Sequence, residues 1–155
     1  MKFCSGQEIA VVLTGLISEK HQIHKYSVDL TVGKVYSMKK EGDLDFGGSE
    51  EKEALIEQIK PVKRTPGDKY GWWNLTAGQY MVEYNEKAVV PEKCLCILQP
   101  LLRTLGAGAM HPTLVFCSGE MVERIVVIVG KSGLNIKENA RISSIMGIEA
   151  VEVKE

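Results

Sequence analysis

The pattern of apolar and polar positions divides the chain into one helical segment and a long β-rich remainder. Near the N-terminus, apolar residues recur at helical spacing over residues 9–16. Ser5 and Glu8 stand just before them, three residues apart, as in a capping box, where the hydroxyl and the carboxylate each accept a backbone N–H. The sequence therefore predicts a short N-terminal helix that begins after Ser5 and ends near Gly15.

From about residue 26 onward, apolar and polar residues alternate with a period of two, which is typical of strands. A hairpin that turns at Gly33-Lys34 is expected over residues 26–38. Further short strands, separated by turn residues, are expected at 72–75, 79–84, 87–90, 94–98, 113–117, 123–129, 141–145 and 148–153. Many short strands with Gly and Pro between them are typical of a sandwich or barrel of the jelly-roll kind. The fold is therefore expected to be mainly β.

The composition is that of an ordinary globular protein, with 155 residues, 45% of them hydrophobic and 25% charged. We expect a single domain over 1–155 in which residues 39–71, rich in Gly, Lys and Glu, form a variable insertion. Within this insertion, residues 49–59 are expected to form either a short helix or a mobile segment.

The charge balance argues against a nucleic-acid partner. The chain has 19 Lys and Arg against 20 Asp and Glu, whereas non-specific binding to phosphates needs a cationic surplus. The cluster of Lys60, Lys63 and Arg64 is interpreted as a solvated loop. No apolar run approaches the roughly 20 residues that cross a bilayer, and the first residues lack the apolar core of a secretion signal. We therefore expect a cytoplasmic protein without a membrane partner.

The cysteines and the first two histidines do not have metal-ligand spacing. Cys4, Cys94, Cys96 and Cys117 are interpreted as small buried apolar residues, because they form no Cys-x-x-Cys pair. His21 and His24 lie in a segment interpreted as a connector, with no further ligand at suitable spacing. We therefore predict no metal site built by the protein alone.

Two apolar features bear on assembly. Residues 125–129 (IVVIV) are apolar on both strand faces, so one face is expected to need cover, which another subunit can supply. Trp72 and Trp73 are neighbours on one strand and point to opposite sides, so one is predicted to be core and the other a cap or interface. An exposed Trp pair would instead be a stacking platform in an unrelated β-barrel binding module.

Two segments invite a catalytic interpretation. Gly130-Lys131-Ser132 resembles part of a phosphate loop, but Ile125 stands where that loop needs a glycine, so we predict a hairpin turn. His111 lies at the end of a glycine-rich loop expected over 103–112. From the residues alone, His111 is either a base or a loop cap.

The order of several short motifs adds more than any of them separately. The chain contains YSVDLTVGKVY, then LTAGQYMVEYNEKAVVPEKCLCIL, then QPLLRTLGAGAMHPTLVFCSGE, and finally SGLNIKENARISSIMGIE. Over nearly the whole length this order resembles the dCTP deaminase and dUTPase superfamily, and the N-terminal helix with SVDL is similar to the deaminase branch. The resemblance implies a distorted jelly-roll β-barrel and a homotrimer. It also implies intersubunit sites that bind a pyrimidine deoxynucleoside triphosphate with Mg2+ and perform dCTP deamination or dUTP hydrolysis.

The resemblance also implies site residues. The phosphate-binding positions correspond to Gln99, Arg103, Thr104 and Gly106, with Thr113 as a further substrate-binding residue, and the candidate catalytic groups are His111 and Glu120.

The chain departs from the family pattern at the reactive positions. Pro100 and Leu101 stand where the family has serines, and Leu114 stands where it has an aspartate. Two hypotheses follow: an enzyme with substituted catalytic groups, or a catalytically inactive homotrimeric paralogue that serves as a structural or regulatory interaction subunit.

Overall fold

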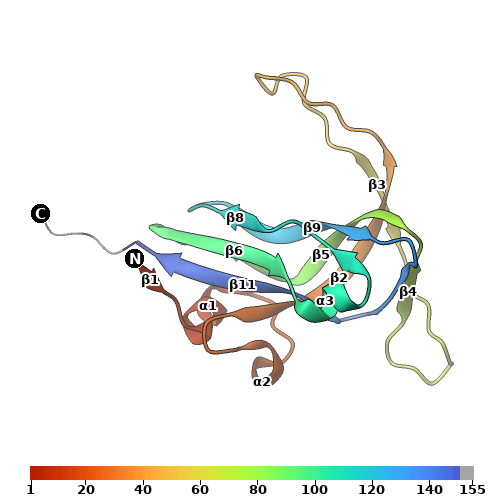
Figure 1. Cartoon of the computed structure of the whole chain (residues 1–155), viewed down its shortest axis with the longest axis horizontal. Coiled ribbons are helices and arrows are strands. Elements are labelled where there is room, and N and C mark those ends of the chain that lie inside the picture. The colour runs from red at the N-terminus through yellow and green to blue at the C-terminus, as the bar shows by residue number, and fades with distance from the viewer. Residues whose placement is uncertain (151–155) are drawn as a thin grey trace, which may run out of the picture.

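The structure is a computed structural model that describes residues 1–150. One curled antiparallel sheet of nine strands forms most of the molecule, in the order β7-β9-β5-β2-β11-β6-β8, with β1 added beside β11 and β3 beside β2 (Figure 1). Its strands are β1 (Lys2–Phe3), β2 (Val28–Lys40), β3 (Leu55–Ile59), β5 (Gly78–Val89), β6 (Cys94–Pro100), β7 (Ala109–Met110), β8 (Leu114–Phe116), β9 (Met121–Val129) and β11 (Arg141–Glu149). A separate two-stranded sheet pairs β4 (Trp72–Leu75) with β10 (Leu134–Lys137). The helices are short: α1 (Gly6–Val12), α2 (Glu19–Gln22) and α3 (Leu102–Gly106).

The predicted N-terminal helix and its cap are confirmed. The Glu8 backbone N–H donates to Ser5 Oγ at 3.2 Å, and the Ser5 backbone N–H donates to a Glu8 carboxylate oxygen at 2.7 Å. The helix ends at Val12, earlier than predicted, and Gly15 follows with a φ of 87°, a conformation that glycine adopts without strain. Lys2 also donates to Glu8, and these bonds together lower the pKa of the Glu8 carboxyl to about 2.

The hairpin predicted at Gly33-Lys34 is wrong, because residues 28–40 form the single strand β2. Gly33 instead marks a bulge, where the register against β5 shifts between Val32 and Lys34. A Cβ on Gly33 would lie 2.8 Å from Asn85 Oδ1 and 3.2 Å from backbone atoms of Asn85 and Glu83, so the close approach of β5 favours glycine there. The first half of β2 pairs with β11 and the second half with β5 and β3.

Two other predicted turns are also bulges or glycine positions within longer strands. Asn85-Glu86, the turn expected between the strands 79–84 and 87–90, is an irregularity inside β5. Gly147, the turn expected between 141–145 and 148–153, lies inside β11, where the side chain of Cys4 covers it. The strand predicted at 148–153 is the end of β11, and its residues 151–153 lie outside the described residues. The turn at Gly130-Lys131-Ser132 is present, but the strands that it joins do not pair with each other, so it is not a hairpin.

The segment 39–71 is more regular than predicted. The helix considered for 49–59 is wrong, since residues 55–59 form β3, paired with β2. Residues 41–53 form a projecting arm between β2 and β3 (Figure 1). Within the expected glycine-rich loop 103–112, the chain forms α3 and β7, neither of which the pattern indicated.

The apolar pattern places the core as expected. Trp73 is buried while Trp72 is only half-buried, which confirms the different roles predicted for this pair. In β9, Ile125, Val127 and Val129 are buried, whereas Ile128 on the opposite face is 40% exposed. That face of β9 therefore lacks cover within one chain. None of the described helices is both long enough and apolar enough to span a bilayer.

Candidate functional site

Two adjoining hollows flank α3, each of about 540 Å³. They share Ala107, Leu134 and Asn135 as walls, and we call them together the α3 cleft. One hollow lies against the turn after β4 and the turn 131–133, and the other against Trp72 and residues 134–142. Of the residues that the resemblance implicates, Arg103 and Thr104 line this cleft.

The two residues from α3 differ in availability. Arg103 is exposed and lies on the wall of the cleft, so its guanidinium is free to meet an anion. Thr104 is buried, and its hydroxyl donates a 2.7 Å hydrogen bond to the carbonyl oxygen of Ile142. That bond attaches α3 to β11, so in this arrangement the Thr104 hydroxyl has a structural role.

The other predicted substrate-binding residues are not among those that line the cleft. Gln99 is half-buried in β6 opposite Ser144 of β11, and Thr113 is exposed between β7 and β8. Gly106 ends α3, and a Cβ built there meets no atom within 4 Å. The space beside Gly106 is therefore open.

His111 belongs to a buried chain of hydrogen bonds. Its Nδ1 lies 2.9 Å from the carbonyl oxygen of Pro112, and its Nε2 lies 2.8 Å from Ser143 Oγ, which in turn is 2.6 Å from the Tyr84 hydroxyl. Because a carbonyl oxygen only accepts, Nδ1 carries the proton, Ser143 donates to Nε2, and Tyr84 donates to Ser143. Burial lowers the pKa of His111 and raises that of Tyr84, so both groups are held neutral.

Glu120 lies apart from His111. Its carboxylate accepts the backbone N–H of Cys117 at 2.7 Å and thereby closes the turn between β8 and β9. Met110 pairs with Ile128 and Val89 with Met121, so His111 and Glu120 are near opposite ends of β9. Six or seven residues of strand separate them, roughly 20 Å. Within one chain, these two candidate catalytic groups do not share a site.

Among the charged residues that line the α3 cleft, basic ones outnumber acidic ones. Arg103, Lys131, Lys137 and Arg141 line it, against Glu138 as the carboxylate among its lining residues. Glu138 is already engaged, since it accepts the Gly71 backbone N–H at 2.6 Å. A hollow with this balance favours an anionic ligand, because the charges attract phosphate or carboxylate groups.

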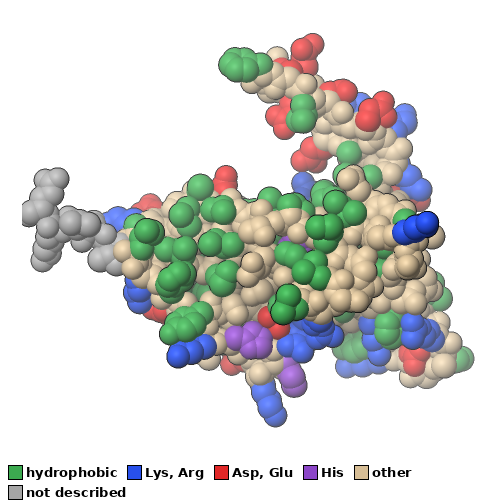
Figure 2. Space-filling model, viewed as in Figure 1, with side chains coloured by type: hydrophobic (Ala, Val, Ile, Leu, Met, Phe, Trp, Pro, Cys, Tyr) green, Lys and Arg blue, Asp and Glu red, His purple; other side chains and the backbone are tan. Residues whose placement is uncertain are grey.

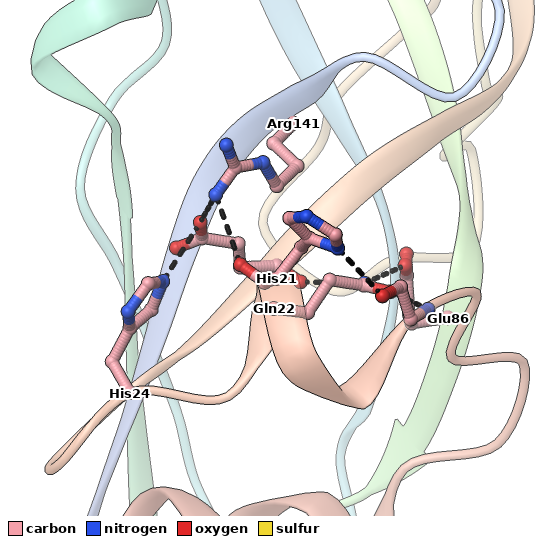
Figure 3. A network of polar contacts seen from close by, with 7 residues as sticks. His21, Gln22, His24, Glu86 and Arg141 are labelled. Carbon is pink, nitrogen blue, oxygen red and sulfur yellow. Dashed lines mark hydrogen bonds and ion pairs between the residues drawn. The ribbon is translucent and has the colours of Figure 1, made fainter.

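The pattern did not indicate the polar network behind this cleft (Figure 3). Arg141 Nη1 donates to Asp29 Oδ2 and to the carbonyl oxygen of His21, both at 2.9 Å, and His24 Nε2 lies 3.0 Å from the same Asp29 oxygen. Asp29 is the acid of the SVDL motif and is buried. The SVDL motif could have indicated this network, because a carboxylate at a buried strand position requires a partner. The network fixes the arginine that forms one wall of the cleft.

The described residues contain no group of three or more His, Cys, Asp or Glu side chains arranged to hold a metal ion. His24 is paired with Asp29, and His21 Nδ1 lies 2.8 Å from Ser18 Oγ. The four cysteines are free thiols. Cys96 is buried as predicted, and burial raises its pKa to about 11. Cys4 and Cys94 are only half-buried, and the prediction of a buried Cys117 is wrong, since that residue is exposed at a turn.

No family model matches the chain, but curated proteins and a solved structure resemble it. Over 137 residues it is 28% identical to a protein of Methanosarcina mazei named "Probable deoxyuridine 5'-triphosphate nucleotidohydrolase", covering 87% of this chain and 77% of that protein. A protein of the same name from Methanosarcina acetivorans is 27% identical over the same coverage.

The fold also has a solved counterpart. The crystal structure of 2'-deoxycytidine 5'-triphosphate deaminase from Agrobacterium tumefaciens superimposes with a TM-score of 0.64 at 14% identity and covers 96% of this chain. The chain spans about half of that deaminase, 48% of its length. This likeness confirms the predicted mainly β, jelly-roll-like fold. By sequence and by fold together, the chain is related to the dCTP deaminase and dUTPase superfamily.

Proposed function

We propose that this protein binds a pyrimidine deoxynucleoside triphosphate in the α3 cleft and hydrolyses dUTP. The observation that carries the proposal is the cationic lining of the cleft, with Arg103 exposed on α3 and Lys137 in one hollow and Lys131 in the other. A triphosphate is the most highly charged part of such a nucleotide, so these side chains supply the attraction. The curated relatives named as dUTP nucleotidohydrolases support dUTP over dCTP.

The reaction requires groups that one described chain does not bring to the cleft. A water molecule must be activated to attack a phosphorus atom and release pyrophosphate, and the one carboxylate among the lining residues, Glu138, is bound to Gly71. The described residues also do not form a ready-made Mg2+ site. Any Mg2+ would therefore be held chiefly by the phosphate oxygens, as is common for this ion.

A homotrimer would complete the site from a neighbouring copy. The outer face of the sheet carries exposed apolar side chains on four strands and on α3 (Figure 2). They are Leu95, Leu102, Leu105, Met110, Val115 and Ile128. Apolar patches of this kind on soluble proteins mark interaction surfaces. We infer that copies of this chain cover the face in the assembled protein, which we expect to work in the cytoplasm.

The second candidate function is a non-catalytic subunit of the same fold. It is favoured because the candidate reactive groups already serve structural contacts. The Thr104 hydroxyl, the His111 ring and the Glu120 carboxylate are each bonded within their own chain, and Pro100 has no N–H to offer a phosphate.

One pair of measurements separates these functions. Thermal unfolding is followed with each deoxynucleoside triphosphate, with and without Mg2+, and the same mixtures are assayed for pyrophosphate and ammonia. A ligand present at 100 times its Kd adds roughly 2.7 kcal/mol to the stability. Stabilisation by dUTP with pyrophosphate release supports the hydrolase, whereas ammonia release from dCTP identifies a deaminase. Stabilisation without product selects the non-catalytic subunit, and no response to any nucleotide overturns the proposed site.

A further inference from the structure

The acidic arm, residues 41–53, is an ordered hairpin that projects away from the sheet (Figure 1). Asp43 and Lys52 exchange backbone hydrogen bonds of 2.8 and 2.9 Å. At the tip, Asp45 Oδ2 accepts from the Ser49 hydroxyl at 3.4 Å and from the Glu50 backbone N–H at 3.2 Å. The arm therefore has a defined shape, although the body of the protein does not pack against its tip.

The surface of this arm combines acidic and apolar groups. It carries six carboxylates and a single lysine, and its acids are Glu41, Asp43, Asp45, Glu50, Glu51 and Glu53. Leu44 is 90% exposed, and the Phe46 side chain is completely exposed. Leaving a phenylalanine in water forgoes about 2 kcal/mol of burial. An ordered segment that presents such a side chain between acids has the chemistry of a docking element for a basic surface.

A matching surface exists on the same chain. The basic strip consists of Lys60, Lys63, Arg64 and Lys69 from the loop before β4, together with Lys137, which pairs with Trp72 across the two-stranded sheet. Asp68 is the one acid between residues 60 and 72. The Arg64 guanidinium lies 3.6 Å from the centre of the Trp72 ring, and Lys137 Nζ lies 5.6 Å from it. Arginine stacked on tryptophan in this way presents a flat face that suits an aromatic ring.

The arm and the strip cannot meet within one molecule. In Figure 1 the arm rises from one corner, whereas the loop between β3 and β4 and the strand β4 occupy the corner below it. Figure 2 shows acidic and apolar side chains along the arm, and Lys and Arg side chains among others at the corner below it. Complementary surfaces that project in opposite directions from one end of a chain are suited to contact between copies rather than within one.

We propose that the acidic arm of one copy docks on the basic strip of a second copy, with Phe46 against the stacked Arg64 and Trp72. Trp72 also lines the α3 cleft, so the docked arm closes one side of that cleft. The docking itself does not depend on the function proposed above, because it is measured without nucleotide.

The test uses the full chain with the photoreactive p-benzoylphenylalanine in place of Phe46. Irradiation of a mixture of isotope-labelled and unlabelled chains, followed by peptide mapping, is expected to give mixed-isotope cross-links between position 46 and residues 60–72. Because the contact is electrostatic and exposed, the yield is expected to fall about fivefold or more between 50 and 500 mM NaCl.

Charge reversal supplies the matched controls. Lys60→Glu with Lys63→Glu is expected to abolish the cross-link, as is Glu50→Lys with Glu51→Lys, and combining reversed chains of the two kinds is expected to restore it. Lys20→Glu with Lys25→Glu makes the same charge change in and just after α2, outside both surfaces, and is expected to retain it. Unfolding temperatures confirm that each variant is folded. Absence of an intermolecular cross-link, or cross-links to a different region, overturns the proposal.

Discussion

The side-chain amide of Gln22 donates a 2.6 Å hydrogen bond to the buried carboxylate of Glu86, joining residues 64 positions apart. The same Gln22 accepts the backbone N–H groups of Ile17 and Ser18, both at 2.8 Å. Glu86 accepts two further bonds, from the backbone and hydroxyl of Thr31. A fully buried carboxylate is tolerated because three donors surround it (Figure 3). One amide thus fastens the segment around α2 to the middle of the sheet.

Replacing this amide is expected to destabilise the protein strongly. Gln22→Leu leaves Glu86 short of one donor and two backbone N–H groups without an acceptor, so we expect a loss of about 2–4 kcal/mol in the free energy of unfolding. Urea unfolding measures the loss. Gln58→Leu, at an exposed position of β3, is the matched control and is expected to stay within about 0.5 kcal/mol of the parent. Equal effects of the two substitutions would contradict the role assigned to Gln22.

The buried His111 makes stability depend on pH. Burial lowers its pKa in the folded protein below the value of about 6.5 expected in the unfolded chain. The unfolded chain therefore binds the proton more readily, so stability is complete above pH 6.5 and decreases as the pH falls through the folded-state pKa. Carboxyl groups with a lowered pKa, such as Glu8, lose their contributions only below about pH 4.5.

The measurement is the unfolding temperature between pH 7 and pH 5, compared with His111→Gln. Glutamine retains a side-chain acceptor for Ser143 but does not titrate in this range. We expect the variant to show a flatter pH profile than the parent. Parallel profiles would show that another group controls stability in this window.

Arg103 provides a direct test of the α3 cleft as a nucleotide site. Its exposed guanidinium has the position from which a phosphate would be bound, so Arg103→Ala is expected to weaken dUTP binding about 10- to 100-fold while leaving the unfolding temperature of the free protein unchanged. Titration calorimetry gives the Kd. Lys20→Ala removes a similar exposed charge away from the cleft. If both variants bind dUTP like the parent, the site lies elsewhere.

Two glycines give contrasting predictions. A Cβ on Gly6 would overlap the carbonyl oxygen of His24, so Gly6→Ala is expected to push α1 from the sheet and cost about 1–3 kcal/mol or more. Gly106→Ala meets open space and is expected to leave stability within about 0.5 kcal/mol of the parent. If Gly106→Ala lowers dUTP affinity while the fold stays intact, a ligand or a neighbouring copy occupies that space. Thermal unfolding with and without dUTP separates these effects.

Most of the long strands and the first helix could be predicted from the sequence because each rests on local periodicity, whereas β1, β3, β7 and β10 were missed. The Ser5–Glu8 cap depends on only four consecutive residues, and the strand 72–75 has the predicted bounds. The hairpin at Gly33 could not be distinguished from a bulge in this way. Glycine suits both, and only the long-range contact with Asn85 decides between them.

The candidate site was less predictable. The resemblance indicated α3 as the phosphate-binding region, and Arg103 does line the cleft there. That the Thr104 hydroxyl bonds to Ile142 and His111 to Ser143 depends on contacts between residues 32 or more positions apart, for which no local pattern gives a signal. The same holds for Arg64, which the charge pattern placed in a solvated loop and which stacks on Trp72.

The continuity of β2 has a consequence for cooperativity. Its thirteen residues pair with β11 at one end and with β5 and β3 at the other, so both halves of the curled sheet share one covalent element. Neither half of the sheet can separate without disturbing the β2 hydrogen bonds that hold the other half in place. The amide protons of residues 28–36 should therefore exchange with solvent only through global unfolding. Thermal unfolding should show a single cooperative transition, without separate unfolding of one half of the sheet.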